Sequence, residues 1–209
     1  MKRIDINNWE RKEYFDFFSK MASPYFGITT EVDCTKAYNI AKEKGYSFFA
    51  YYLYKSLVAA NFIEELRLRI IDNEVILLEK MSIGTTVGRK NGTYGLAFVE
   101  YSDSFEDFNA ALQKEIEAVH HSVGLRLNDD AKRTDLIHYS TIPWTSFSAI
   151  LHPRSLDKIE SIPKIVFGKY SEREGHKFLP ISIEANHALA DGFHLAKFLN
   201  KFQQELDNE

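Results

Sequence analysis

Apolar and polar residues alternate with two different periods in the first third of the chain. The spacing predicts a helix over residues 8–21, capped by Asn8, and a strand over residues 26–33. Thr35 can cap a short helix, and Ser47 begins a longer helix that is rich in aromatic residues. Helices therefore dominate this part of the chain.

Extended patterns dominate the middle of the chain. Residues 66–70 alternate leucine and isoleucine with arginine, which is the pattern of a half-exposed strand. Asn91-Gly92 lies between two β-like runs and predicts a tight hairpin in which both central residues have positive φ. Ser104 can then cap an amphipathic helix whose apolar residues recur at steps of three and four.

The rest of the chain predicts a polar loop, several strands and a closing helix. Strands are expected at residues 136–140, 145–151, 164–170 and 177–185. Helices that come early, strands that come late and one closing helix favour an α+β sandwich with a mixed or antiparallel sheet. No linker or repeat divides the sequence, so we expect one domain over residues 1–209.

The composition narrows the class of protein. Of 209 residues, 44% are hydrophobic, which is enough for a large core and excludes a disordered chain. The net charge of −4 gives no basic signal for nucleic acid. No apolar run approaches the ~20 residues of a membrane helix, and the N-terminus has no secretory signal. We therefore expect a cytoplasmic protein that binds neither nucleic acid nor membrane.

The segment over residues 185–193 is the most informative stretch of chemistry. His187 falls at the end of a predicted strand, and a helix begins just after Gly192. Imidazole titrates near neutral pH, which suits removal of a proton from a thiol or a hydroxyl. Asp191 can pair with an arginine or cap the helix. On its own, this His-x-x-x-Asp-Gly string favours an ordinary strand-to-helix turn over a catalytic site.

Other reactive residues are weaker signals on their own. Ser140 ends a predicted strand, and its hydroxyl could donate to a developing oxyanion, although a turn serine that bonds nearby backbone is favoured in isolation. Cys34, the single cysteine, could have a lowered pKa ahead of a helix, but a small buried residue is the favoured interpretation. The histidines form no metal-binding motif, so no metal is expected.

Four blocks of the sequence, taken together and in order, resemble the trimeric chloramphenicol acetyltransferase family of CoA-dependent acyltransferases. The blocks are residues 9–15, 140–147, 167–170 and 186–194. The spacing from Ser140 to His187 also fits the family, and the resemblance spans nearly the whole chain. Ordered blocks are far more specific than the short string, so the interpretation of an ordinary turn gives way to a catalytic one.

The resemblance implies a fold, an assembly and a mechanism. The fold would be a two-layer α/β sandwich with a large mixed sheet, and the chains would form a homotrimer with active sites at subunit interfaces. His187 would be the general base that activates an alcohol toward acetyl-CoA, with its tautomer fixed by a bond to a backbone carbonyl. Ser140 would stabilise the oxyanion, and Asp191 would pair with Arg11 to hold the catalytic turn.

The resemblance also implies two groups of binding residues. Matches on the coenzyme side are Ser140, Trp144, Lys169 and Tyr170. Matches around the pocket for the small-molecule alcohol are Phe17, Phe18, Phe26, Leu127 and Val166. No metal takes part in the implied reaction.

The departures from the family pattern concern the acceptor pocket and the coenzyme side. Asn186 stands where a second histidine is usual, Val166 replaces a threonine, and Phe18 lacks a tyrosine hydroxyl. Leu127 stands for a pocket phenylalanine, and Phe49 for a hydroxyl-bearing aromatic residue. Acetyl transfer to an alcohol is therefore better supported than chloramphenicol as the acceptor, because losing a buried polar partner shifts substrate preference.

Two alternatives remain open at this point. The first is the catalytic core of a dihydrolipoyl acyltransferase, which resembles this family and shares the His-x-x-x-Asp-Gly string. The second is a CoA-binding homologue that keeps the scaffold without catalysis, an interpretation suggested by Asn186 and Val166.

Overall fold

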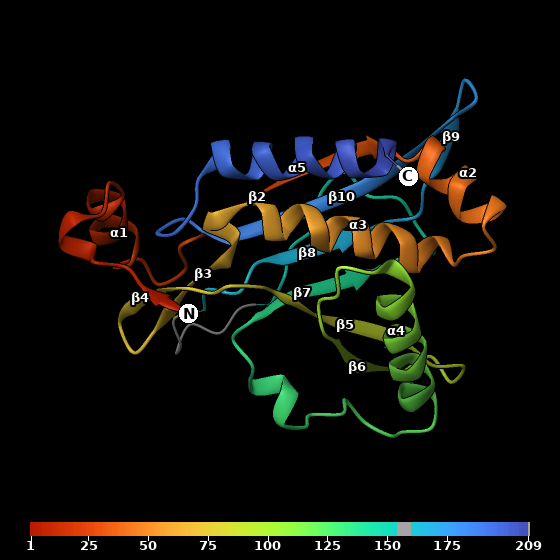
Figure 1. Ribbon diagram of the computed structural model, residues 1–209, viewed down its shortest axis with the longest axis horizontal. Helices are drawn as coiled ribbons and strands as arrows, with labels where there is room; N and C mark the ends of the chain where they lie inside the picture. Colours follow the sequence, from red (N-terminus) through yellow and green to blue (C-terminus); the bar gives the residue numbers. More distant parts are fainter. Residues whose placement is uncertain (154–159, 209) are drawn as a thin grey trace.

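A large mixed sheet runs through the computed structural model, which describes residues 1–153 and 160–208 (Figure 1). In these residues the sheet has seven strands, and β5, β7 and β8 run parallel in its centre. The strand order is β2 (Tyr25–Asp33), β10 (His176–Asn186), β8 (Lys164–Phe167), β7 (Leu136–Thr141), β5 (Ser82–Gly88) and β6 (Tyr94–Val99), with β9 (Ser171–Arg173) beside β10.

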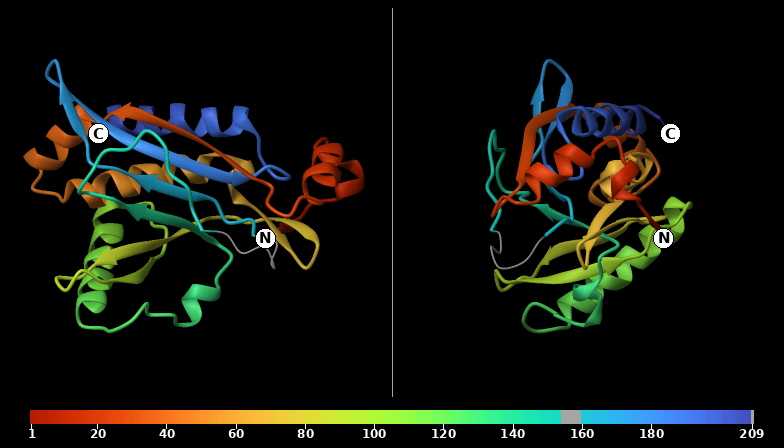
Figure 2. Two further views of the ribbon diagram at one scale, coloured as in Figure 1. Left: turned by 180° about the vertical axis from the view of Figure 1, so that it is seen from behind. Right: turned by 90° about the vertical axis from the view of Figure 1, so that its left-hand side faces the viewer.

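Helices cover one face of this sheet. In the right-hand view of Figure 2, α3, α4 and α5 lie on one side of the strands, and the chain after β7 crosses the other side. The helices are α1 (Lys12–Phe18), α2 (Thr35–Glu43), α3 (Phe48–Phe62), α4 (Phe105–His120) and α5 (Gly192–Asp207), with short 3-10 turns η1 (Ile6–Asn8), η2 (Glu64–Arg67) and η3 (Asp129–Lys132). This arrangement confirms the predicted two-layer α+β sandwich. None of the helices in the described ranges is both long and apolar enough to cross a membrane.

The two faces of the central strands carry different side chains. Ile137 and Tyr139 of β7 are buried in the core beneath the helices. His138 and Ser140 point to the opposite face, because successive residues of a strand face opposite sides. Helix α3 packs in the core and is apolar on nearly every side. It begins after Ser47, as predicted, and the Ser47 hydroxyl caps it. The polar side chains of β7 that could bind a ligand therefore lie on the helix-free face of the sheet.

A small sheet attaches the N-terminal segment to the rest of the molecule. In the described residues it consists of β1 (Lys2–Arg3), β4 (Glu74–Leu77) and β3 (Leu68–Ile71). Trp9 and Phe15 pack against its buried side together with Leu189. Because Leu189 lies in the turn after β10, the first residues of the chain support that turn.

Two predicted helix starts are wrong. Asn8 lies in a 3-10 turn where its side chain donates to Asp5, and α1 begins only at Lys12. Thr35 is the first residue of α2 and does not cap it, since the cap position is Cys34; the Thr35 hydroxyl donates to the Asp33 carboxylate. A cap accepts from the first backbone N–H groups of a helix, but the Thr35 hydroxyl oxygen accepts from the Lys177 N–H. Asn8 lies three residues before Arg11, which holds the cap position of α1.

Two predicted extended features also differ from the structure. Residues 145–151 form no strand and cross the helix-free face as irregular chain after Pro143, which has no backbone donor for a ladder. The Asn91-Gly92 turn is not a two-residue hairpin, because only Gly92 has positive φ and residues 89–93 form a longer loop between β5 and β6.

Arg69 corrects the prediction of a half-exposed strand over residues 66–70. Its side chain is fully buried, with 0% of the residue exposed. The guanidinium donates to the carbonyl oxygens of Leu66, Leu68, Thr134 and Leu136 at 2.7–3.0 Å. Several donors arranged as a rigid fork let one arginine satisfy carbonyls from two distant segments. Arg69 thereby joins β3 of the small sheet to the start of β7.

Replacing Arg69 tests this link. We expect Arg69→Met to lower the free energy of unfolding by about 3 kcal/mol or more, because buried carbonyls lose their donors. Urea denaturation followed by circular dichroism measures the change. Arg3→Met is the matched control, since Arg3 pairs with Glu74 at the surface and its loss leaves the midpoint nearly unchanged. Equal midpoints for both variants would contradict the structural role of Arg69.

Candidate active site

The turn between β10 and α5 is shaped by Asn186. This residue is 1% exposed, and its side-chain oxygen accepts from the backbone N–H of Ala188 while its amide donates to the Glu160 carbonyl. The backbone N–H groups of Leu189 and Ala190 donate to the Asn186 carbonyl. Asn186 thus satisfies the polar backbone of a tight, buried turn and fixes where His187 leaves the sheet.

His187 is held by aromatic rings. Its imidazole stacks on Phe18, with ring centroids 3.9 Å apart and planes 3° from parallel, and lies 4.2 Å from the ring of Phe26. The His187 backbone N–H donates to the carbonyl of Pro24 at 2.7 Å. Nδ1 is buried without a hydrogen-bond partner in the described part of the chain. The expected bond from the ring to a backbone carbonyl is therefore absent there, and packing rather than hydrogen bonding orients the ring.

Asp191 fulfils both roles that the sequence left open. One carboxylate oxygen lies 2.6 Å from Arg11 Nη1, and the other caps α5 by accepting from the Phe193 N–H at 3.0 Å. His194 completes a capping box by accepting from the Asp191 N–H. Burial raises the pKa of Asp191, but the Arg11 hydrogen bond and the charges of His194 and Arg11 outweigh it, so the pKa lies below its ordinary value.

Ser140 lies where two cavities meet. Its hydroxyl is 3.0 Å from that of Thr86, which stands beside it on the neighbouring strand β5. A cavity of about 720 Å³ opens on one side of this pair, and a second of about 360 Å³ opens on the other. Both residues line both cavities. The Ser140 side chain is therefore part of the wall of both cavities.

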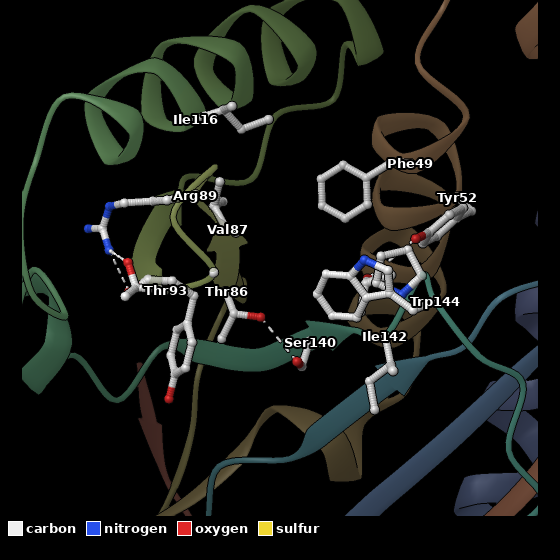
Figure 3. A pocket seen from close by; sticks show the side chains of 15 residues that line it. Phe49, Tyr52, Thr86, Val87, Arg89, Thr93, Ile116, Ser140, Ile142 and Trp144 are labelled. Atoms are coloured by element: carbon white, nitrogen blue, oxygen red, sulfur yellow. Dashed lines mark hydrogen bonds between the residues drawn. The ribbon is translucent and has the colours of Figure 1, made fainter.

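The larger cavity includes one predicted coenzyme residue besides Ser140. Figure 3 shows Trp144 and Phe49 on one side of this cavity and Arg89 on the other. Lys169 is exposed and Tyr170 packs in an aromatic cluster with Tyr38, so neither lines this cavity in the described chain. The structure therefore brings Trp144 to Ser140 and leaves the other two predicted residues outside.

The predicted acceptor residues fall into two separate groups. Leu127 and Val166 line the smaller cavity beside Ser140. Phe18 and Phe26 surround His187 instead, and Phe17 is 62% exposed with its ring edge against Phe18. Within one chain the pocket residues thus divide between the serine and the histidine.

Strand register explains this division. Ser140 pairs with Val166 across β7 and β8, and Val166 pairs with Ser182 across β8 and β10. His187 lies five residues beyond Ser182, which places it about 17 Å along the strands and about 10 Å across them from Ser140. The two residues of one chain cannot contact the same small molecule at its reacting atoms.

Some residues of the site could not be found from local patterns in the sequence. Thr86 is found only through the pairing of β5 with β7, which a single sequence does not reveal. His138 and Lys164 line the smaller cavity, and strand alternation could have placed His138 on the face of Ser140.

Cys34 is no nucleophile, because burial and the charge of Asp33 raise its thiol pKa to about 12. No three metal-ligating side chains converge within residues 1–153 and 160–208.

The ion pair between Asp191 and Arg11 predicts a pH-dependent contribution to stability. Because the folded-state pKa is depressed, this contribution is complete above the unfolded value of about 3.9 and is lost as pH falls through the folded value. We expect Asp191→Asn to lower the free energy of unfolding by about 1–2 kcal/mol at pH 7, with the difference shrinking below pH 4. Denaturant titrations across pH measure it.

A surface ion pair provides the control for this experiment. Asp16 pairs with Lys12 on α1 and is 48% exposed. Asp16→Asn should leave the unfolding midpoint nearly unchanged at pH 7. A difference for Asp191→Asn that stays constant down to pH 3 would contradict the ionic origin of its effect.

Comparison with known proteins agrees with the blocks found in the sequence. The family model described as chloramphenicol acetyltransferase matches residues 1–203. A chloramphenicol acetyltransferase of Campylobacter coli is 30% identical, over 98% of each chain. A solved structure named chloramphenicol acetyltransferase superposes with a TM-score of 0.91 at 32% identity, covering 98% of this chain and 100% of the other.

A more distant likeness concerns the fold alone. A solved dihydrolipoamide acetyltransferase of Azotobacter vinelandii shares 16% identity at a TM-score of 0.67, over 89% of this chain and 82% of the other. The full-length matches, by contrast, include sequence as well as shape. The chain belongs to the chloramphenicol acetyltransferase family.

Proposed function

We propose that this protein transfers the acetyl group of acetyl-CoA to a hydroxyl of a small molecule, chloramphenicol or a related alcohol. The observation that carries this proposal is the position of Ser140 between two cavities. The larger cavity suits the acetyl-bearing end of the coenzyme, with Trp144 at its wall, and the smaller suits the acceptor. The relatives named above are chloramphenicol acetyltransferases, which supports this acceptor class.

The reaction needs a base and an oxyanion donor at one carbonyl carbon. His187 takes the proton of the acceptor hydroxyl as its oxygen forms a bond to the thioester carbon. Ser140 donates to the resulting tetrahedral oxyanion, and Thr86 keeps its hydroxyl in place. When the oxyanion collapses, the carbon–sulfur bond breaks, and the imidazolium returns its proton to the departing thiolate. No metal is required at any of these steps.

The proposed reaction requires two copies of the chain. Because His187 and Ser140 are far apart within one chain, the base of one subunit must face the serine of a neighbour. Phe17 packs against Phe18 beside the histidine, is 62% exposed, and offers apolar surface to such a neighbour. In keeping with the family resemblance, we propose that this assembly is a homotrimer with active sites at its interfaces. We also propose that it works in the cytoplasm and that each subunit is one domain.

The two alternative functions are less well supported. The dihydrolipoamide acetyltransferase likeness is one of shape, whereas the chloramphenicol acetyltransferases match by sequence over the full chain. A non-catalytic CoA-binding protein would have no need for the Ser140 and Thr86 hydroxyls at the junction of two cavities. Asn186, which suggested that alternative, has a structural reason in the turn it holds.

The first test is thiol release from acetyl-CoA in the presence of chloramphenicol. We expect His187→Ala to abolish turnover, and Ser140→Ala to lower kcat by about 10²–10³ because one oxyanion donor is lost. His120→Ala is the matched control, since His120 is exposed at the end of α4, and it should retain full activity. Full activity of His187→Ala would refute the mechanism, and wild-type inactivity toward every alcohol would refute the function.

Mixed oligomers test the shared site. If each site combines His187 of one subunit with Ser140 of another, co-expression of His187→Ala and Ser140→Ala chains creates some complete sites. Random mixing in equal amounts should restore about a quarter of wild-type turnover, although each variant alone is nearly inactive. Thiol release by the purified mixture measures this. Activity no higher than that of the two separate variants would mean that both residues act within one chain.

A further inference from the structure

The smaller cavity is lined by both apolar and polar side chains. Its apolar lining includes Leu96, Phe98, Leu127 and Val166. Its polar lining includes His138, His152 and Lys164, which the proposed reaction does not use. His138 and Lys164 lie in the row of the sheet next to Ser140 and Val166, so an acceptor in this cavity meets apolar side chains and groups that can form hydrogen bonds.

His138 is positioned to form a hydrogen bond with a group of the acceptor that lies away from the reacting hydroxyl. It lies two residues before Ser140 on the same face of β7, which separates the two positions by about 7 Å. Its ring lies beside Gly84, where a methyl group in place of the glycine hydrogen would be in van der Waals contact with Cδ2 at 3.5 Å. The ring has no hydrogen-bond partner among residues 1–153 and 160–208 and is exposed to the cavity.

The charge state of His138 favours a neutral partner. The surrounding protein desolvates the imidazolium, and the charges of Lys164 and Arg69 oppose it further, which lowers the pKa to about 4. At neutral pH the ring therefore has one N–H donor and one nitrogen acceptor. A group with both capacities, left unpaired at a cavity wall, is ready to bond to a ligand.

Lys164 adds a donor without adding a site for an anion. It pairs with His138 in the parallel register of β7 and β8, so the two side chains are neighbours on one face. Its ammonium already contacts a carboxylate oxygen of Glu160 at 2.9 Å and the carbonyl of Pro153 at 3.3 Å. The remaining hydrogen can be donated, while the charge is compensated by Glu160. A neutral oxygen fits this environment better than a carboxylate or a phosphate.

We infer that His138 is a specificity-determining residue that recognises a neutral, oxygen-bearing group of the acceptor, such as an amide or another carbonyl, about 7 Å from the acetylated hydroxyl. This inference rests on the proposed acetyl transfer and narrows its substrate class. The acceptor is an alcohol with an apolar body and one polar group at its far end. An acceptor with a methyl group in that position would leave the imidazole unpaired beside it.

Two alcohols that differ only at the far end test this inference. 4-(Hydroxymethyl)benzamide and 4-methylbenzyl alcohol share a ring and a primary hydroxyl, and one carries an amide where the other carries a methyl group. We expect the wild-type enzyme to have a kcat/KM at least about tenfold higher for the amide. His138→Phe should remove this preference by raising KM for the amide, with kcat for the methyl compound unchanged.

Two further variants separate recognition from simple packing. His138→Gln keeps a donor and an acceptor and should retain much of the preference. His120 lies outside both cavities, at the exposed end of α4, and His120→Ala should leave the ratio of the two kcat/KM values unchanged. Equal kcat/KM values for both alcohols in the wild-type enzyme, or a ratio that His138→Phe does not alter, would overturn the inference.

A measurement that needs no turnover distinguishes this inference from the proposed function. In protein labelled with ¹⁵N-histidine, the His138 signals are assigned by their absence in His138→Phe. We expect the amide, and not the methyl compound, to shift these signals. If no alcohol releases CoA but the shift occurs, acetyl transfer fails and recognition stands. If CoA is released but no shift occurs, recognition fails and acetyl transfer stands.

Discussion

The parallel register of β5, β7 and β8 is the constraint on which the candidate site depends. Parallel pairing sets Thr86, Ser140 and Val166 side by side on the helix-free face. A shift of any strand by one residue would turn its site residue into the core and bring a core residue to the surface. The core beneath, with Tyr139, Ile165 and Phe167, prevents that shift, because each of these side chains is buried. Core packing thereby fixes the position of the serine hydroxyl.

The histidine depends on contacts that come from the other end of the chain. Arg11 reaches Asp191 across 180 residues of sequence, and Trp9 packs in the same cluster as Leu189. These contacts hold the turn, while Phe18 and Phe26 hold the ring itself. A rigid turn that relies on ion pairing and aromatic stacking needs no hydrogen bond at Nδ1 to orient the imidazole. The first residues of the chain are therefore part of the machinery that positions His187.

Local patterns in the sequence predicted the elements well, but not their partners. Helix α3 and strand β10 follow from capping and alternation, and the pairing of Asp191 with Arg11 followed from the resemblance. The prediction that Arg69 is exposed is wrong because alternation normally places arginine in solvent. No local sequence pattern shows that carbonyls at the start of β7 surround it. Thr86 was missed for the same reason, since its role exists only through pairing with a distant strand. Contacts between segments that are distant in the sequence cannot be predicted from local patterns in one sequence.

In the proposed site, different residues recognise the acceptor close to the reacting hydroxyl and far from it. Val166 lies beside Ser140 and offers no hydrogen bond, so in the proposed reaction the polar groups near the reacting atoms are the hydroxyls of Ser140 and Thr86. In the proposed site, His138 and Lys164 supply groups that can bond to the acceptor farther along the same strands. A polar contact remote from the reaction binds the ground state and the transition state about equally, so it lowers KM rather than raising kcat. In such a site, the choice of acceptor can change through residues such as His138 while the serine and histidine chemistry stays the same.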